Sequence, residues 1–121
     1  MSKSDDAKLV LNELEGKVPD IKGSAIIRTN GLIIVSALPQ ESSERMIAAM
    51  SAALLGTSKR ASESLFQGVF KSLHITIDKG DLFLLESGKV ILVTMTNSEP
   101  NVGLVTLEME EASAKIKSIF E

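Results

Sequence analysis

The sequence predicts an α/β sandwich (an α+β fold) in which a five-stranded antiparallel sheet lies between helices on both of its faces. Apolar residues recur at helical spacing near both ends of the chain and in its middle. Between these helices, β-rich segments are joined by Asn-Gly, Lys-Gly and Ser-Gly turns. Several of the strands are apolar at consecutive positions, which is typical of a sheet covered on both faces. The expected order of elements is α-β-β-α-β-β-β-α.

The first elements are a helix and a β-hairpin. Residues 4–6, Ser-Asp-Asp, offer an N-cap and negative charge at a helix start, and apolar residues follow at helical spacing. Asn30-Gly31 favours a tight type I′ turn between strands near 23–29 and 31–37. Both strands of this hairpin contain neighbouring apolar residues, so we expect both faces of the hairpin to be covered.

The second half of the chain predicts a long helix, a three-stranded meander and a final helix. The long helix is expected over 41–65. The strands follow over 69–78, 81–86 and 89–96, and the last of them is almost continuously apolar, which favours a central position in the sheet. The final helix is expected over about 103–120. The first and last helices are expected side by side on one face, with the long helix on the other.

The helix over 41–65 is apolar on more than one side. One broad stripe is expected to pack on the sheet, and its members are Met46, Ile47, Met50, Ala53, Leu54, Ala61 and Leu65. Mostly small residues lie off this stripe: Ala48, Ala49, Ala52, Leu55 and Gly56. They predict a helix–helix contact between two subunits, because small side chains let another backbone approach closely. The alternative is that the alanines only reflect the high helix propensity of Ala.

Composition limits the class of protein. The 121 residues form one domain, with an ordered core over about 5–120. A net charge of −3 and an aromatic content of 3% argue against a nucleic-acid partner, which needs clustered cations and stacking side chains. The chain has no cysteine, so disulfides and thiolate chemistry are excluded. With no signal-peptide pattern and no long apolar run, we expect a cytoplasmic protein without direct membrane insertion.

Residues with catalytic or metal-binding potential are scattered. The only histidine, His74, lies on the polar side of a predicted strand and is expected to be exposed or lightly buried. Carboxylate pairs such as Asp78 with Asp81 fall at turns, helix starts and exposed helix faces, where charge serves solubility or capping. The Gly-Thr-Ser-Lys-Arg segment at 56–60 lacks the spacing of a phosphate-binding loop. We therefore expect no enzyme, no catalytic residue, no cofactor and no metal.

Four features together resemble a known family. They are the hairpin with Gly31, the Ala-rich MIAAMSAALLG helix, the VFKSLHITIDKGDLFLLESGKVILVTMT meander and the closing NVGLVTLEMEEASAKI helix. In this order they resemble the Roadblock/light-chain family over about residues 5–120, and in particular its stand-alone prokaryotic MglB-like members, which regulate small Ras-like GTPases. The fold implied is the Roadblock-like relative of the profilin sandwich.

The resemblance implies a homodimer that binds a small Ras-like GTPase. In such dimers the second helices, here 41–65, pack together and the third strands, here 69–78, pair edge to edge. A regular edge strand also needs protection, and pairing supplies it. The expected dimer interface comprises Ala48, Ser51, Ala52, Leu55, Leu73, His74, Ile75, Thr76 and Ile77. The expected GTPase-binding surface comprises Arg45, Lys59, Arg60 and Glu63.

Other functions stay open at this point. Profilin-like and PAS-like domains share a similar order of elements, so a small-molecule sensor is one alternative, although few polar or aromatic residues are available to line its cavity. A second alternative is a scaffold subunit of a motor or membrane-tethered complex. The charged residues of the long helix could also serve solubility alone. Pairing with a paralogue in place of a second copy is open as well.

Overall fold

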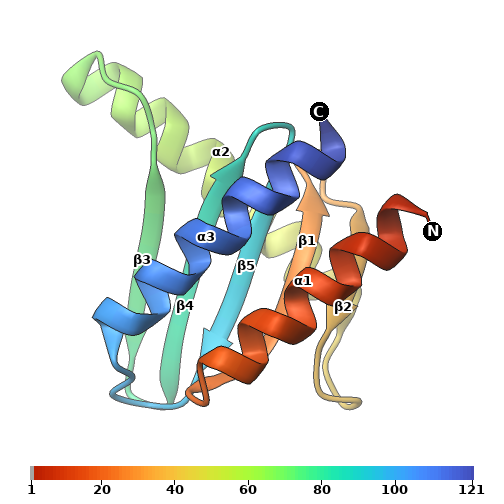
Figure 1. The fold of residues 1–121 in the computed structure, drawn as a ribbon. Helices are drawn as coiled ribbons and strands as arrows, with labels where there is room; N and C mark the ends of the chain where they lie inside the picture. The colour runs from red at the N-terminus through yellow and green to blue at the C-terminus, as the bar shows by residue number, and fades with distance from the viewer. Residues whose placement is uncertain (1) are drawn as a thin grey trace.

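A computed structural model describes residues 2–121 and has the predicted order of elements (Figure 1). The elements are α1 (Lys3–Lys17), β1 (Ile21–Arg28), β2 (Ile33–Ala37), α2 (Glu44–Phe66), β3 (Ser72–Ile77), β4 (Gly80–Ser87), β5 (Val90–Thr96) and α3 (Val102–Phe120). The predicted α/β sandwich is confirmed. The predicted helix over 41–65 begins later in the structure, at Glu44, because Ser43 is its N-cap and accepts a hydrogen bond from the Met46 amide.

The five strands form one sheet in the order β2-β1-β5-β4-β3, and all neighbouring pairs are antiparallel. The apolar strand β5 is central, as predicted, and nearly every residue in it is buried. The two edge strands are β2 and β3. Because β3 pairs only with β4, one row of its backbone groups faces outward.

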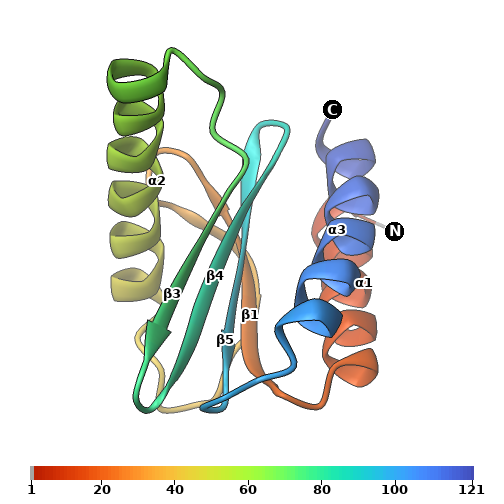
Figure 2. The same cartoon turned by 90° about the vertical axis from the view of Figure 1, so that its left-hand side faces the viewer.

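Helices cover both faces of the sheet, as predicted. Helices α1 and α3 lie side by side on one face and α2 lies alone on the other (Figures 1 and 2). Two apolar clusters fill the layers. The larger, between the sheet and α1 and α3, includes Leu11, Ile26, Leu92 and Ile116. The smaller, under α2, consists of Ala25, Ile27, Ala48, Leu55, Leu84, Ile91 and Val93.

Two turn predictions were wrong in detail. Helix α1 is capped by Ser2, whose hydroxyl accepts from the Asp5 amide in a capping box, and not by residues 4–6. The hairpin turn is not type I′, because Gly31 adopts a positive φ of 90° and Asn30 does not. The Gly31 amide instead donates to the Arg28 carbonyl, and the Arg28 amide donates to the Leu32 carbonyl, which closes a longer loop over 29–31. Beside this turn the pairing of β1 with β2 shifts register and skips Ile34, the extra residue on β2.

The predicted core stripe of α2 was wrong for most of its members. The buried side chains of the helix are Ala48, Ser51 and Leu55, while Met46 and Met50 are 65% and 61% exposed. The helix therefore turns Ala48, Ser51 and Leu55 toward the sheet and its methionines away from it. The physical reason is close approach: a helix that packs tightly on a sheet needs small side chains at the contact. Ile47 and Leu54, on the flank of the helix, pack partly against the cluster under α2.

Two glycines, Gly80 and Gly16, give a matched test of how closely the backbone packs around them. A Cβ on Gly80 would lie 2.3 Å from the Thr96 carbonyl oxygen, whereas a Cβ on Gly16 would meet nothing within 4 Å. We expect Gly80→Ala to lower the free energy of unfolding by about 2–3 kcal/mol, because β4 cannot move away from β5 without losing pairing. Gly16→Ala, inside α1, should raise it by about 0.5–1 kcal/mol. Urea denaturation followed by circular dichroism measures both, and equal effects of the two changes would contradict this packing.

Two glutamates of α1 are held in opposite electrostatic environments. The carboxylate of Glu15 accepts a hydrogen bond from the Ser24 hydroxyl at 2.5 Å, and burial raises the pKa of Glu15 above its ordinary value of 4.5. Glu13 is exposed and pairs with Lys115 and Lys17, each at 3.0 Å. These two ammonium groups lower the pKa of Glu13.

The two glutamates should affect the pH dependence of stability with opposite signs. A raised native pKa means that the folded chain holds more protons than the unfolded chain. The contribution of Glu15 to the free energy of unfolding therefore falls as pH rises above 4.5. A lowered native pKa means that the Glu13 contribution is present above 4.5 and is lost as pH falls through the native pKa. As pH rises from about 4 to about 7, Glu15→Gln should become more stable relative to the unmutated protein. Over the same rise, Glu13→Gln should become less stable relative to it. Denaturation curves at several pH values check this, and parallel profiles would contradict it.

Candidate functional site

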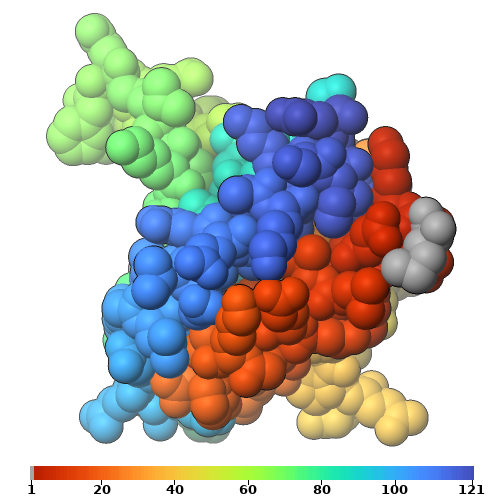
Figure 3. Space-filling model, in the orientation of Figure 1, coloured from red at the N-terminus to blue at the C-terminus, as the bar shows by residue number. Residues whose placement is uncertain are grey.

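The outward side of α2 carries an apolar stripe. Met46, Met50 and Ala53 recur at helical spacing and are all exposed. Exposed apolar residues in a row differ from the scattered single residues that are normal on protein surfaces. At the C-terminal end of the helix, Leu65 and Phe66 are exposed as well. This end of α2 and the loop to β3 project from the body of the molecule (Figures 1 and 3).

Edge strand β3 also presents apolar side chains on the face of the sheet that α2 covers. Leu73 and Ile75 are half-buried on the α2 face of the sheet, and Ile77 is exposed. The alternation of β3 predicted from the sequence is therefore confirmed. Helix α2 packs mainly over β1 and β2, so it leaves the α2 face of β3 only partly covered. We call the outward stripe of α2 (Met46, Met50 and Ala53) together with β3 the α2–β3 surface.

The structure separates the predicted dimer residues into two groups. On β3, Leu73, His74, Ile75, Thr76 and Ile77 all lie on the free edge strand, within the α2–β3 surface. On α2, by contrast, Ala48, Ser51 and Leu55 are buried against the sheet. Ala52 lies beside the hairpin turn, with its Cβ 3.8 Å from where a Cβ on Gly31 would stand. The four α2 residues therefore serve contacts within the protomer, and the side chains that α2 presents outward are those of its apolar stripe.

The four charged residues predicted for a partner surface are all exposed on α2. Two of them make contacts inside the chain. The Lys59 ammonium pairs with the Glu86 carboxylate on β4 at 2.9 Å, and the Arg60 guanidinium donates to the Thr57 hydroxyl at 3.3 Å. Within residues 2–121, neither Arg45 nor Glu63 takes part in an ion pair. Lys59 is thus held toward the sheet, and Arg45, Arg60 and Glu63 are more available to a partner.

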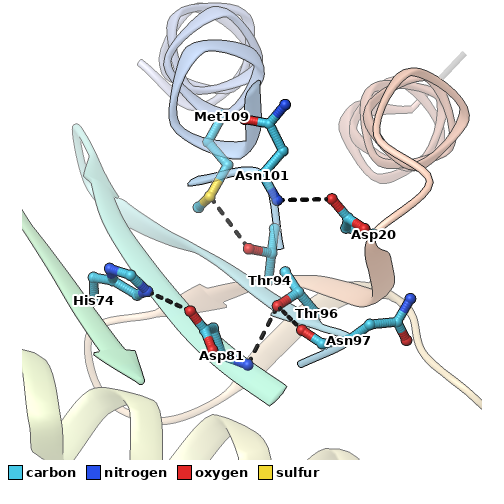
Figure 4. Close-up of polar contacts among 8 residues, drawn as sticks. All are labelled: Asp20, His74, Asp81, Thr94, Thr96, Asn97, Asn101 and Met109. Atoms are coloured by element: carbon cyan, nitrogen blue, oxygen red, sulfur yellow. Dashed lines mark hydrogen bonds and ion pairs between the residues drawn. The ribbon is translucent and has the colours of Figure 1, made fainter. Parts of the chain in front are cut away.

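One polar cluster was missed by the sequence analysis. Asp81 was expected at an exposed turn, but its side chain is only 3% exposed and pairs with the His74 imidazole at 2.7 Å (Figure 4). Its backbone amide donates to the Thr96 hydroxyl at 3.2 Å. The available signal was the alternation of β4, which places Asp81 on the same face as buried Phe83. Among the described residues, no group of three or more His, Cys, Asp or Glu side chains could hold a metal ion.

Comparison with known proteins identifies the family. The family model of the Roadblock/LC7 domain matches residues 6–96. The chain belongs to the Roadblock/LC7 family. Among curated proteins, the uncharacterized protein MJ1340 of Methanocaldococcus jannaschii is 33% identical over 116 residues, which span 96% of this chain and 98% of that protein. The resemblance drawn from the sequence alone is therefore confirmed.

Two solved structures are similar to this Roadblock/LC7 domain throughout. Myxococcus xanthus MglB superimposes with a TM-score of 0.89 at 22% identity, covering 96% of this chain and 88% of that one. A structure described as MglB with tetrameric arrangement gives a TM-score of 0.90 at 17% identity, covering 98% and 90%. At 22% and 17% sequence identity, the similarity to these two structures shows a shared fold. Within residues 2–121, none of the helices has the length and apolar character needed to cross a membrane.

Proposed function

We propose that this Roadblock/LC7 domain is a non-enzymatic homodimeric platform that binds and regulates a small Ras-like GTPase in the cytoplasm. Family membership supports a role of this kind, since the MglB-like members that the sequence resembles are GTPase regulators. The same family is built of regulatory or scaffold domains, which supports a platform in preference to an enzyme. The proposal also accounts for the outward apolar side chains of α2, which the fold itself does not use.

The observation that carries the proposal is the α2–β3 surface. It comprises an exposed apolar helix stripe and an edge strand with unpaired backbone groups. An exposed regular edge is a template for pairing with another strand, and an exposed apolar stripe is a mark of an interaction site. A second copy related by two-fold symmetry offers both a β3 edge and an α2 stripe at once. Pairing two β3 strands joins the two sheets and covers both apolar features in one step.

The charges of α2 are the proposed contact for the GTPase. Arg45, Arg60 and Glu63 lie exposed on the helix and offer both signs of charge, which favours orientation by charge complementarity. The chain contains three arginines, and the third, Arg28, ends strand β1. Arg45 and Arg60 sit within a helix, a poor position from which to reach a γ-phosphate. Any stimulation of hydrolysis should therefore come from rearranging the switch residues of the GTPase.

Dimerisation is tested by placing a charge on each of two exposed apolar residues. Met50 on α2 and Leu9 on α1 are 61% and 55% exposed, and they lie on opposite faces of the sheet. We expect Met50→Glu to weaken dimerisation at least tenfold, about 1.4 kcal/mol, because a buried carboxylate at the interface lacks a partner. Leu9→Glu, the matched control, should leave the dimer unchanged. Size-exclusion chromatography with light scattering, over a dilution series, measures both.

Two outcomes would contradict the homodimer. The first is an unmutated protein that stays monomeric at tens of micromolar, a concentration at which a specific interface with a Kd of about 1 μM is mostly formed. The second is equal weakening by Met50→Glu and Leu9→Glu, which would place the contact elsewhere. Circular dichroism of both variants confirms that the fold is retained.

GTPase binding is tested with small GTPases from the same source, loaded with GDP or a GTP analogue. We expect binding that prefers one nucleotide state and weakens about tenfold in Arg45→Ala or Arg60→Ala, through loss of charge complementarity. Lys117→Ala on α3, on the other face of the sheet, is the matched control. Calorimetry measures binding, and single-turnover hydrolysis measures stimulation.

The outcomes separate three cases. Binding with changed turnover supports a regulator, and binding with unchanged turnover supports a scaffold. Absence of binding to every GTPase in both nucleotide states contradicts the proposal. One further result would show that an arginine acts on the phosphate directly. It is a more than about tenfold loss of stimulated GTP hydrolysis in one arginine variant, measured with all of the GTPase bound.

A further inference from the structure

The C-terminal end of α2 and the turn after it carry the most exposed large apolar side chains within residues 2–121. Leu65, Phe66 and Val69 are 73%, 82% and 89% exposed. We call these three residues the tip. The segment 64–70, which contains them, has no charged residue. Large apolar side chains gathered in one exposed place mark an interaction site, and the fold of the protomer leaves these three uncovered.

The tip has a defined shape. Gln67 ends α2 in the left-handed conformation, with a φ of 52°. The Gly68 amide then donates to the Ser62 carbonyl at 3.1 Å, which is the long hydrogen bond of a Schellman motif. Just beyond the tip, Phe70 packs against the cluster under α2. The chain is therefore anchored on both sides of the tip, and the tip side chains stay outside the core.

The tip overhangs the free edge of the sheet. In Figure 1 the C-terminal end of α2 reaches past edge strand β3, and in Figure 3 it stands out from the body of the molecule. Figure 2 shows that this end lies on the α2 face of the sheet. Because the tip comes directly before β3 in the chain, it lies where β3 starts. A molecule that pairs with the edge of β3 would therefore come against the tip.

A hollow of about 450 Å³ opens at the other end of β3. Its apolar side chains are Ile77 at the end of β3, Leu82 of β4, Met95 of β5 and Pro39 of the segment before α2. Leu82 also packs against the cluster under α2, so the hollow lies on the α2 face. Its volume falls within the range of roughly 300–1,000 Å³ that is typical of binding pockets. The hollow is therefore large enough to receive an aromatic side chain.

The lining of this hollow favours an apolar occupant without charge. Its charged residues are two lysines and two carboxylates: Lys22, Lys79, Glu41 and Asp81. Because the two signs balance, neither an anion nor a cation is preferred by charge. Apolar side chains from four segments, by contrast, gain from burial against an apolar group. The uncharged, apolar tip has the matching chemistry.

Pairing of two β3 strands would bring the tip and the hollow together. In an antiparallel pair, the start of each strand lies opposite the end of the other. A two-fold axis at right angles to the sheet keeps both α2 helices on one face. The tip of each copy, which precedes β3, then lies over the end of β3 in the other copy. Strands are about 4.8 Å apart, so Ile77 and Leu82 of that copy would lie one and two strand spacings from the paired edge.

We propose that the tip of each copy docks into the hollow of the other copy, with Phe66 as the anchor. This inference rests on the homodimer of the proposed function and adds a contact beyond the α2 stripe and the β3 edge. An aromatic side chain seated in a pocket of the partner is a common form of interface hot spot. By symmetry the contact forms twice, once at each end of the β3 pair. It accounts for both the exposed tip and the open hollow.

The first test follows the environment of the tip. The chain has no tryptophan or tyrosine, so Phe66→Trp places a single reporter there. We expect its fluorescence emission to move to shorter wavelength as the dimer forms, because the indole leaves water. The change should follow the same concentration dependence as the mass measured by light scattering. Leu107→Trp on α3, where Leu107 is 55% exposed on the other face of the sheet, is the matched control and should show no shift.

The second test measures what the anchor contributes. Phe66→Ala should weaken dimerisation by about tenfold or more, as expected for an aromatic anchor. Leu107→Ala, the matched control, should weaken it by less than about twofold, as expected outside the interface. Both side chains are exposed in the protomer, so both variants should stay folded, which circular dichroism checks.

The third test assigns the tip to the hollow of the other copy. The chain has no cysteine, so Val69→Cys combined with Glu41→Cys places one thiol beside Phe66 and one at the hollow. The two positions flank α2, whose 23 residues span about 35 Å. A much shorter bismaleimide therefore cannot join them within one chain. We expect it to give a covalent dimer with the double variant and little with either single variant, whose two thiols lie at opposite ends of the dimer.

Three results would overturn the inference and leave the homodimer in place. They are a dimer in which the emission of Phe66→Trp does not shift, unchanged dimerisation of Phe66→Ala, and a double-cysteine variant that dimerises without cross-linking. Any of them would mean that the tip is free for a different occupant. An unmutated chain that stays monomeric would overturn the homodimer as well, so the two failures are distinguishable.

Discussion

The width of the sheet is the constraint on which the rest of the structure depends. Five strands about 4.8 Å apart span roughly 19 Å between the two edges, whereas a helix with its side chains is about 10 Å across. Two helices, α1 and α3, therefore cover one face, but α2 alone covers only part of the other. The central strand β5 is buried on both sides, whereas the edge strand β3 is largely exposed. A sheet of this width with three helices has one incompletely covered side.

This asymmetry makes the two faces of the molecule different. The face under α1 and α3 has the larger apolar cluster and needs no further cover, so a polar pair such as His74 and Asp81 is tolerated near its border. The α2 face has the smaller cluster, and its free area is apolar. The edge strand β3 presents alternate side chains to the two faces of the sheet.

Periodicity predicted the order of elements, the central position of β5 and the placement of helices on both faces. It predicted these because each depends on local pattern and turn residues. It failed on α2, where hydrophobicity ranks methionine above alanine and serine but the helix packs through Ala48, Ser51 and Leu55. Which face of an apolar helix lies inward depends on how closely it approaches the sheet, and that distance is a tertiary property. Burial of Asp81 depended likewise on contacts between strands, with His74 of β3 and Thr96 of β5.

The inverted packing of α2 has a consequence for binding. Small residues inward bring the helix close to β1 and let the hairpin turn at Gly31 approach Ala49 and Ala52. Because Ala48, Ser51 and Leu55 make the buried contact with the sheet, the large flexible side chains of Met46 and Met50 face outward. Methionine has an unbranched, polarisable side chain that adapts to differently shaped surfaces. The residues that sequence reasoning assigns to the core are therefore suited, by the same chemistry, to cover an interface.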